Sequence, residues 1–138
     1  MPGKGTAPKS GQALVDRVAA LAGSLNLMVS REVRVGRRVW GAQRRIDLVL
    51  TGQNNRRLGL ECKAQSTAGT AEEKIPATIQ DIEAWPIPGL VVFEGEGFSP
   101  NMASFLISTG KAVEFSDLEN WLRLFFGLSL PEDVDGST

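Results

Sequence analysis

The sequence predicts one α/β (α+β) domain in which helices flank a mixed central sheet, and three features support this fold class. The chain has 138 residues, enough for a single domain with a buried core. Its hydrophobic share of 42% and charged share of 22% are ordinary for a globular protein. Segments with apolar residues at helical spacing alternate with short segments rich in Val, Ile and Leu, which indicates strands between helices.

The first half predicts one helix and then a group of strands. Residues 1–10 are rich in Pro and Gly and lack an apolar stretch, so they are interpreted as a disordered tail and not as a signal peptide. Apolar residues recur at helical spacing from about 11 to 23, after Ser10 as a candidate N-cap. Strands are expected at 27–35, around 38–40, at 46–50 and, after a hairpin loop, at 58–65.

The second half alternates helices with single strands. Helices are expected at 70–84, from 99 or 100 to about 109, and from a capping box that begins at Ser116. Short strands are expected at 89–93 and 112–115. We therefore expect one domain over residues 11–128, followed by an acidic tail over 129–138.

Missing residue types exclude several classes of function. The absence of histidine excludes Ser–His and Cys–His catalysis, histidine metal sites and nucleases of the HNH type. The absence of tyrosine excludes GIY-YIG nucleases and tyrosine recombinases. Cys62 is the single cysteine, so no internal disulfide forms, and the cytoplasm of a bacterium or phage-infected cell is the expected compartment. No apolar run is long enough for a membrane span, so no membrane partner is expected.

The near-neutral net charge of −1 hides a strong asymmetry along the chain. Residues 1–63 contain 12 Lys and Arg against 4 Asp and Glu, whereas residues 64–138 contain 3 against 12. Such segregation indicates a basic face that binds a polyanion, unless the fold mixes the two halves of the chain.

Asp47, Glu61 and Lys63 form the constellation that carries chemistry. Side chains alternate across a strand, so Glu61 and Lys63 share one face of their strand while Leu60 and Cys62 share the other. A short hairpin places Asp47 beside this polar row. The alternative interpretation is a solvated strand face with a cross-strand ion pair.

These groups suit metal-assisted hydrolysis of a phosphodiester. Two carboxylates and the backbone carbonyl of Cys62 offer oxygen ligands to a hard cation, so we expect Mg²⁺ or Mn²⁺ and no small-molecule cofactor. Such a cation polarises a phosphoryl oxygen and lowers the pKa of a bound water. An adjacent lysine orients or deprotonates that water and offsets developing charge.

The pattern of Asp47, thirteen residues and then Glu61-Cys62-Lys63 resembles the signature of the PD-(D/E)XK nuclease superfamily. The predicted order of elements over residues 11–93 resembles its restriction-endonuclease-like αβββαβ core, with the C-terminal strand and helices as additions. The resemblance implies that Asp47 and Glu61 bind metal and that Lys63 is the catalytic lysine. The sequence departs from the signature at Ile46, which stands where the named proline would be.

The resemblance implies further site residues. Gln65 lies on the face of Glu61 and Lys63 and is a candidate catalytic residue that binds water or phosphate. An additional acid would be Asp16 or Glu32. Thr70 and Lys74 open a predicted helix, where backbone amides bind phosphate. For each of these residues, an ordinary surface or capping role is the alternative.

Arginines supply the main basic cluster. Eight lie within 27 residues, with Glu32 and Asp47 as the acids between them. They are Arg31, Arg34, Arg37, Arg38, Arg44, Arg45, Arg56 and Arg57. The seven from Arg34 onward are predicted to hold the DNA backbone, and solvated hairpins are the alternative.

The resulting hypothesis is a metal-dependent endonuclease acting on DNA, either selective for branched structures, like a junction resolvase or phage-type enzyme, or restriction-like. Cleavage of both strands would need a homodimer, for which the apolar C-terminal helix is a candidate surface unless it completes the core. A non-catalytic DNA-binding or accessory subunit with the same fold is the second hypothesis. A protein-interaction module that uses the charge split is the third.

Overall fold

The computed structural model describes residues 6–37, 43–64, 70–95, 100, 104 and 107–129; within these, the side chains of 6–10, 35–37, 43–44 and 70–75 are outside the description. The elements are α1 (Thr6–Ser24), β1 (Met28–Arg37), β2 (Gln43–Thr51), a 3-10 turn η2 (Gln53–Asn55), β3 (Arg57–Ala64), α2 (Thr70–Glu83), β4 (Gly89–Glu94), β5 (Ala112–Glu114) and α4 (Phe115–Phe126). The predicted mixed arrangement of helices and strands is confirmed.

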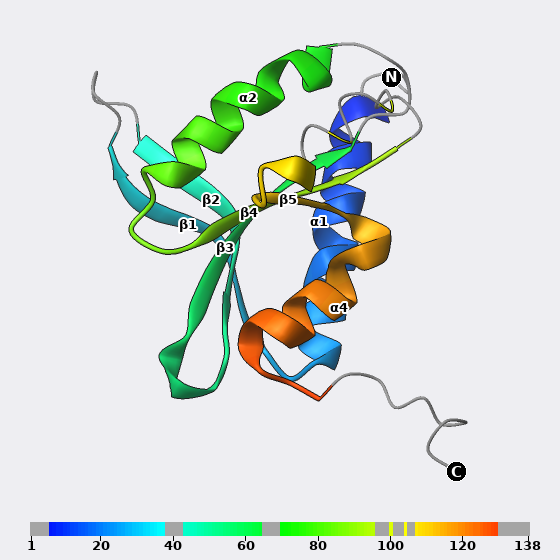
Figure 1. The fold of residues 1–138 in the computed structure, drawn as a ribbon. Helices are drawn as coiled ribbons and strands as arrows, with labels where there is room; N and C mark the ends of the chain where they lie inside the picture. The colour runs from blue at the N-terminus through cyan, green and yellow to red at the C-terminus, as the bar shows by residue number, and fades with distance from the viewer. Residues whose placement is uncertain are drawn as a thin grey trace.

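The sheet has five strands in the order β1-β2-β3-β4-β5 (Figure 1). The first three strands pair antiparallel through short connections. Strand β4 pairs parallel with β3, and β5 pairs parallel with β4. Parallel neighbours need a crossover connection, and α2 supplies the one between β3 and β4. The sheet is therefore mixed, with β1 and β5 at its edges.

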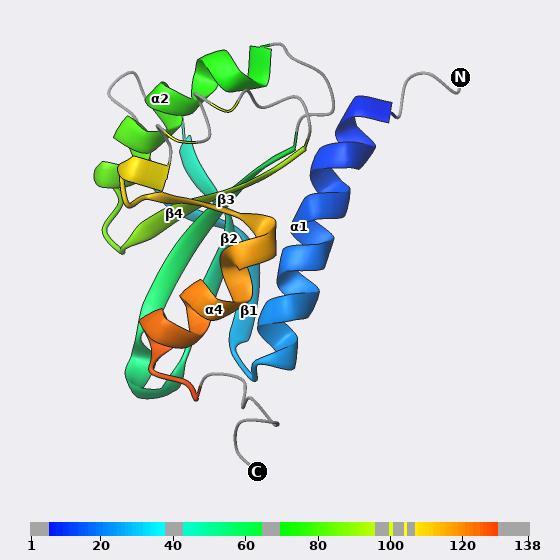
Figure 2. The same cartoon turned by 45° about the vertical axis from the view of Figure 1, so that its right-hand side comes forward.

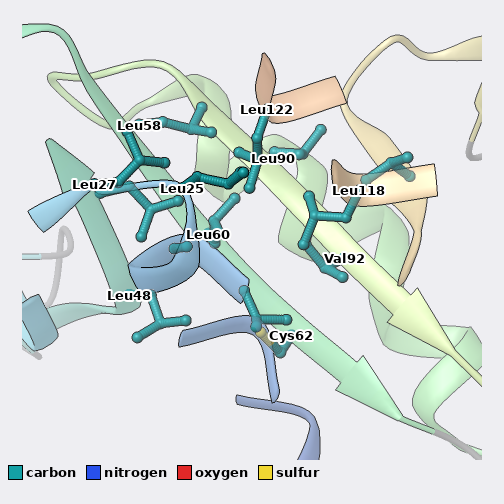
Figure 3. Close-up of a cluster of buried hydrophobic side chains, with 14 of the residues drawn as sticks. Leu25, Leu27, Leu48, Leu58, Leu60, Cys62, Leu90, Val92, Leu118 and Leu122 are labelled. Carbon is teal, nitrogen blue, oxygen red and sulfur yellow. The ribbon is translucent and has the colours of Figure 1, made fainter. Parts of the chain in front are cut away.

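Helices cover both faces of this sheet (Figures 1 and 2). Helices α1 and α4 pack on one face through Leu14, Val18, Leu118 and Leu122, which contact buried leucines of β2, β3 and β4. Figure 3 shows part of this core, with Leu60 and Cys62 of β3 beside Leu118 and Val92. Helix α2 and the residues after it cover the other face through Ile79, Ile82 and Trp85.

The first helix begins earlier than its sequence predicts. It starts at Thr6, five residues before the expected start at 11, so Ser10 lies inside the helix and is not its N-cap. The predicted tail over residues 1–10 therefore overlaps α1. Pro8 is compatible with this start because it falls in the first turn, where a backbone N–H has no helical acceptor. The separate strand expected around 38–40 lies outside the described residues.

The C-terminal helices lie where the sequence predicts them, but the predicted N-cap of the last helix is wrong. The described residues Pro100, Ser104, Ile107 and Ser108 are helical, and the helix ends at Gly110, whose φ is 72°. Helix α4 begins at Phe115 after Glu114, and its N-cap makes no side-chain hydrogen bond, so the capping box predicted at Ser116 is wrong. Residues 130–138 of the predicted acidic tail lie outside the described part.

The apolar side of α4 completes the core. Leu118 and Leu122 are fully buried, and Trp121, Phe125 and Phe126 pack against the same cluster. Leu124, 70% exposed, is a large apolar side chain that the helix leaves in solvent. Of the two roles considered for this helix, packing inside one chain is the one observed. Within the described chain, no helix has the length and apolar content needed to cross a bilayer.

Candidate active site

Asp47 and Glu61 meet where β2 and β3 separate. The ladder between these strands runs from Thr51 and Arg57 to Leu48 and Leu60. Asp47 and Glu61 follow as the next opposed residues. There the Cys62 N–H donates to Asp47 Oδ2 at 3.0 Å, and the Asp47 N–H donates to Glu61 Oε2 at 3.4 Å. Each carboxylate thus accepts a backbone hydrogen bond from the strand that carries the other.

A local distortion of β2 accompanies this separation. Leu48 and Leu50 face the core under α1, but Ile46 and Val49 face the core under α2. Regular alternation would put Ile46 on the side of Leu48, so the strand changes its facing near Asp47. Glu32, the β1 residue opposite this point, has a φ of 50°, a left-handed value that is uncommon outside glycine. Strand β2 near Asp47 and strand β1 at Glu32 therefore both depart from regular strand geometry.

Lys63 shares the face of Glu61. Both side chains are half-buried, whereas Leu60 and Cys62 point into the core under α1. In the parallel register, Glu61 lies beside Val91 and Lys63 beside Phe93, two buried residues of the α2 side. Glu61 and Lys63 therefore lie on one side of β3, next to buried apolar residues of β4.

Burial and charge shift the protonation of this group. Burial raises the pKa of Glu61, the nearby Asp47 carboxylate raises it further, and the Lys63 ammonium opposes the shift, leaving a pKa of about 8. The carboxyl groups of Asp47 and Glu61 are close enough to share a hydrogen bond. Two acids held this closely in a low-dielectric position favour either a proton or a cation between them.

Cys62 contributes its backbone and not its thiol. The side chain is 8% exposed and lies in the core under α1, and burial raises the pKa of its thiol. The expected placement of Cys62 on the core face of its strand agrees with this position, and a buried thiol of raised pKa is unreactive.

Comparison with known proteins identifies the family. The profile of the PD-(D/E)XK nuclease superfamily domain matches residues 6–121. The chain belongs to the PD-(D/E)XK nuclease superfamily. Nucleases of this superfamily generally use divalent metal ions.

A solved structure shows the same fold. The crystal structure of AF1548, described as a protein of unknown function, aligns with a TM-score of 0.52 at 19% sequence identity. The alignment covers 74% of this chain and 56% of the other, so this chain spans little more than half of that protein. The comparison with curated proteins finds no match.

In this PD-(D/E)XK chain, the side chains of the two candidates for an additional acid contact arginines. Asp16 is exposed on α1, where its carboxylate accepts from Arg31 at 2.8 Å and from Gln12 at 3.0 Å. The Glu32 side chain is 71% exposed and lies 3.5 Å from Arg45. Within the described residues, no group of three or more His, Cys, Asp or Glu side chains is arranged to hold a metal.

The arginines separate into two groups. Arg34 and Arg45 oppose each other on β1 and β2. Arg56 and Arg57 lie at the β2–β3 turn, where the Arg56 guanidinium is 4.5 Å from the centroid of the Phe125 ring. Before that turn, Thr51 lies six positions along β2 from Arg45, a distance of about 20 Å. The single cluster suggested by sequence proximity is therefore two surfaces.

Other predicted site residues fall outside the described side chains. Gln65 and Arg38 are outside the described residues altogether. The remaining four have a described backbone only: Arg37 ends β1, Arg44 lies in β2, Thr70 begins α2 and Lys74 lies in its first turns.

One feature of the surface had no sequence signal. An open groove of about 580 Å³ lies between the β2–β3 turn and the C-terminal end of α4, lined by residues that include Asn54, Arg56, Phe125 and Gly127. Its two walls come from segments some 70 residues apart, so no local pattern could predict it. It does not include Asp47, Glu61 or Lys63.

Proposed function

We propose that this chain is a divalent-metal-dependent nuclease that hydrolyses phosphodiester bonds in DNA, with Asp47, Glu61 and Lys63 as its active centre. The meeting of Asp47 and Glu61 at the end of the β2–β3 ladder supports the proposal most directly. The alternative, a solvated strand face with a cross-strand ion pair, does not explain why each of the two acids accepts a backbone hydrogen bond from the strand of the other. Membership of a nuclease superfamily supports the same activity.

The donor set fits a hard divalent cation. One oxygen of each carboxylate accepts a backbone N–H, which orients the group and leaves its second oxygen for a metal ion. Asp47, Glu61 and the carbonyl of Cys62 would hold Mg²⁺ or Mn²⁺, because the described set offers oxygen ligands. When bound, the ion supplies Lewis-acid polarisation of the phosphoryl group and a more acidic water.

Lys63 serves the reaction through its charge and its protons. Its ammonium lies near enough to Glu61 to influence that carboxyl, so it also borders any phosphate held there. It orients the attacking water and offsets the negative charge that develops on the phosphoryl oxygens. The attacking water gives up a proton as its oxygen bonds to phosphorus, the bond from phosphorus to the leaving oxygen breaks, and the leaving oxygen takes up a proton.

DNA is the proposed substrate because basic side chains flank the site. Arg34 and Arg45 lie on strands that lead to Asp47, and both are exposed. Together with the basic side chains of Arg37, Arg38, Arg44 and Lys74, they would hold phosphates beside the site. We propose endonucleolytic cutting of branched or duplex DNA by a homodimer, since one such centre cuts one strand.

Cleavage of supercoiled plasmid and of a four-way junction tests the proposal. Wild-type protein is assayed with Mg²⁺, with Mn²⁺ and with EDTA, beside Asp47→Asn, Glu61→Gln and Lys63→Ala. Asp117→Asn, which removes an exposed acid from α4, is the matched control. We expect metal-dependent nicking by wild type and control and its loss in the other three.

Two results would separate the proposal from the alternatives. Activity that survives both Asp47→Asn and Lys63→Ala contradicts the proposed centre. Tight DNA binding without cleavage in any metal favours a non-catalytic accessory subunit. Light scattering of the protein alone and with DNA tests the homodimer.

A further inference from the structure

The β1–β2 hairpin continues beyond the rest of the sheet. Pairing between β1 and β2 extends to Arg37 and Gln43, whereas the described pairing of β2 with β3 ends at Leu48 and Leu60. Residues 33–37 and 43–46 therefore form a two-stranded extension, named here the distal ribbon. Figure 1 shows β1 and β2 turning together away from the ends of β3 and β4.

The distal ribbon is anchored beside the candidate active site. Val33 and Ile46 oppose each other and pack into the core under α2. The ribbon leaves β3 at Asp47, the residue whose carboxylate accepts the Cys62 N–H. Since Val33 and Ile46 hold one face, alternation directs Arg34 and Arg45 to the other.

Among the described residues, the charges of Arg34 and Arg45 are poorly compensated. Arg34 and Arg45 are directly opposed, an arrangement that is unfavourable for like charges in an antiparallel pair. Arg34 forms no ion pair with any described residue, and Arg45 has one exposed contact with Glu32 at 3.5 Å. By contrast, Arg31, nearer the start of the same strand, is bound by Asp16 at 2.8 Å. An anionic ligand would relieve the repulsion at the distal pair.

From these observations we propose that the distal ribbon enters the major groove of duplex DNA, with Arg34 and Arg45 on the phosphates that border that groove. Neighbouring strands lie about 4.8 Å apart, and a major groove about 12 Å wide admits a two-stranded ribbon. The deep, narrow major groove of A-form RNA does not. This inference rests on the proposed function for the choice of DNA, and it narrows the substrate to a duplex.

Binding in EDTA tests the ribbon without catalysis. Fluorescence anisotropy is measured with labelled duplex DNA, single-stranded DNA and duplex RNA over a series of salt concentrations. We expect the duplex DNA to bind tightest. A bulky group at C5 of the pyrimidines, which projects into the major groove, should weaken binding about tenfold or more, whereas a minor-groove ligand such as netropsin should compete little.

Variants place the contact on the ribbon. Arg34→Gln and Arg45→Gln should each reduce the slope of log K against log salt by about 0.9, the value for one lost phosphate contact. Arg31→Gln is the matched control on the same strand, and its slope should stay near wild type because Asp16 already occupies that guanidinium. Thermal melting verifies that all three variants fold.

Three outcomes overturn the inference: equal binding of single and double strands, binding unaffected by the C5 group, or unchanged salt slopes for Arg34→Gln and Arg45→Gln. Its failure differs from failure of the proposed function. If cleavage depends on Asp47 but DNA binding does not depend on Arg34 or Arg45, only the ribbon inference is contradicted. If duplex binding depends on Arg34 and Arg45 but no metal supports cleavage, only the proposed nuclease activity is contradicted.

Discussion

The backbone N–H of Cys62 donates to the carboxylate of Asp47 across 3.0 Å, in the place where a strand-to-strand hydrogen bond would otherwise continue the sheet. The side chain of one strand thereby satisfies a backbone donor that the separating neighbour no longer reaches. Asp47 is thus both a structural acceptor and the proposed metal ligand, and substitutions can distinguish the two roles.

Asp47→Ala should lower the free energy of unfolding by about 1–3 kcal/mol, because it leaves the part-buried Cys62 N–H without an acceptor. Asp47→Asn keeps a side-chain oxygen for that N–H and removes the negative charge. We expect near-wild-type stability for Asp47→Asn together with loss of metal-dependent cleavage. Urea denaturation beside the plasmid assay measures both. Equal destabilisation by the two substitutions would contradict the hydrogen-bonding role.

The pKa of Glu61 predicts how stability depends on pH in the absence of metal. The pKa is about 8 in the folded chain and 4.5 in its ordinary state, so between these values the folded protein holds a proton that the unfolded chain releases. This contribution to stability is fully present below pH 4.5 and is lost as pH rises through 8. Glu61→Gln should remove this pH dependence. Urea denaturation of wild type and variant from pH 5 to 9 measures the free energy of unfolding of both proteins. Parallel pH curves would contradict the shift.

Metal binding should reverse that dependence. A bound cation requires the charged form of Glu61, so metal affinity should rise as pH increases toward about 8 and proton release should accompany binding. Calorimetry with Mn²⁺ in two buffers of different ionisation enthalpy measures the released protons. Asp117→Asn is again the control. Affinity that is constant across this pH range would show that Glu61 is not a ligand.

Lys63→Ala should act on the chemistry and on Glu61 together. Loss of the ammonium removes the influence that lowers the pKa of Glu61, so the pH at which metal affinity rises should move upward. Cleavage should fall about 100-fold or more, in the range for a removed charge-stabilising group. Lys63→Arg keeps the positive charge, so it should restore the pH at which metal affinity rises more fully than it restores the cleavage rate. A rate loss without any pH shift would separate Lys63 from Glu61.

Strand alternation was sufficient to predict the polar side of β3. The apolar residues Leu58, Leu60 and Cys62 all face the core under α1, so Glu61 had to face the other way. The same periodicity could not predict where β2 leaves β3, because that depends on the left-handed Glu32 and on the change of facing at Asp47. The two groups of arginines are separated by the length of β2, which local sequence proximity did not reveal.

The start of α1 shows a second limit of local patterns. Pro and Gly before residue 11 are typical of a loop, yet Thr6 begins the helix. A proline in the first turn breaks no helical hydrogen bond, and the buried Leu14 and Val18 anchor the helix on the sheet. The helix therefore continues into a segment whose composition disfavours it.

Gly89 allows α2 to lie close to the sheet beside the candidate site. A Cβ at this position would be 2.5 Å from Ile82 Cγ2 and 2.6 Å from Trp85 Cε3, distances that require the packing to shift. Gly89→Ala should therefore destabilise the fold by about 1–3 kcal/mol through overpacking and alter the emission of the buried Trp85. Gly23→Ala is the matched control, because a Cβ there meets no atom within 4 Å and α1 continues through it. Replacing a helical glycine with alanine should stabilise by about 0.5–1 kcal/mol, so the two substitutions should move the melting temperature in opposite directions. A neutral or stabilising Gly89→Ala would mean that α2 does not lie against β4 as closely as described.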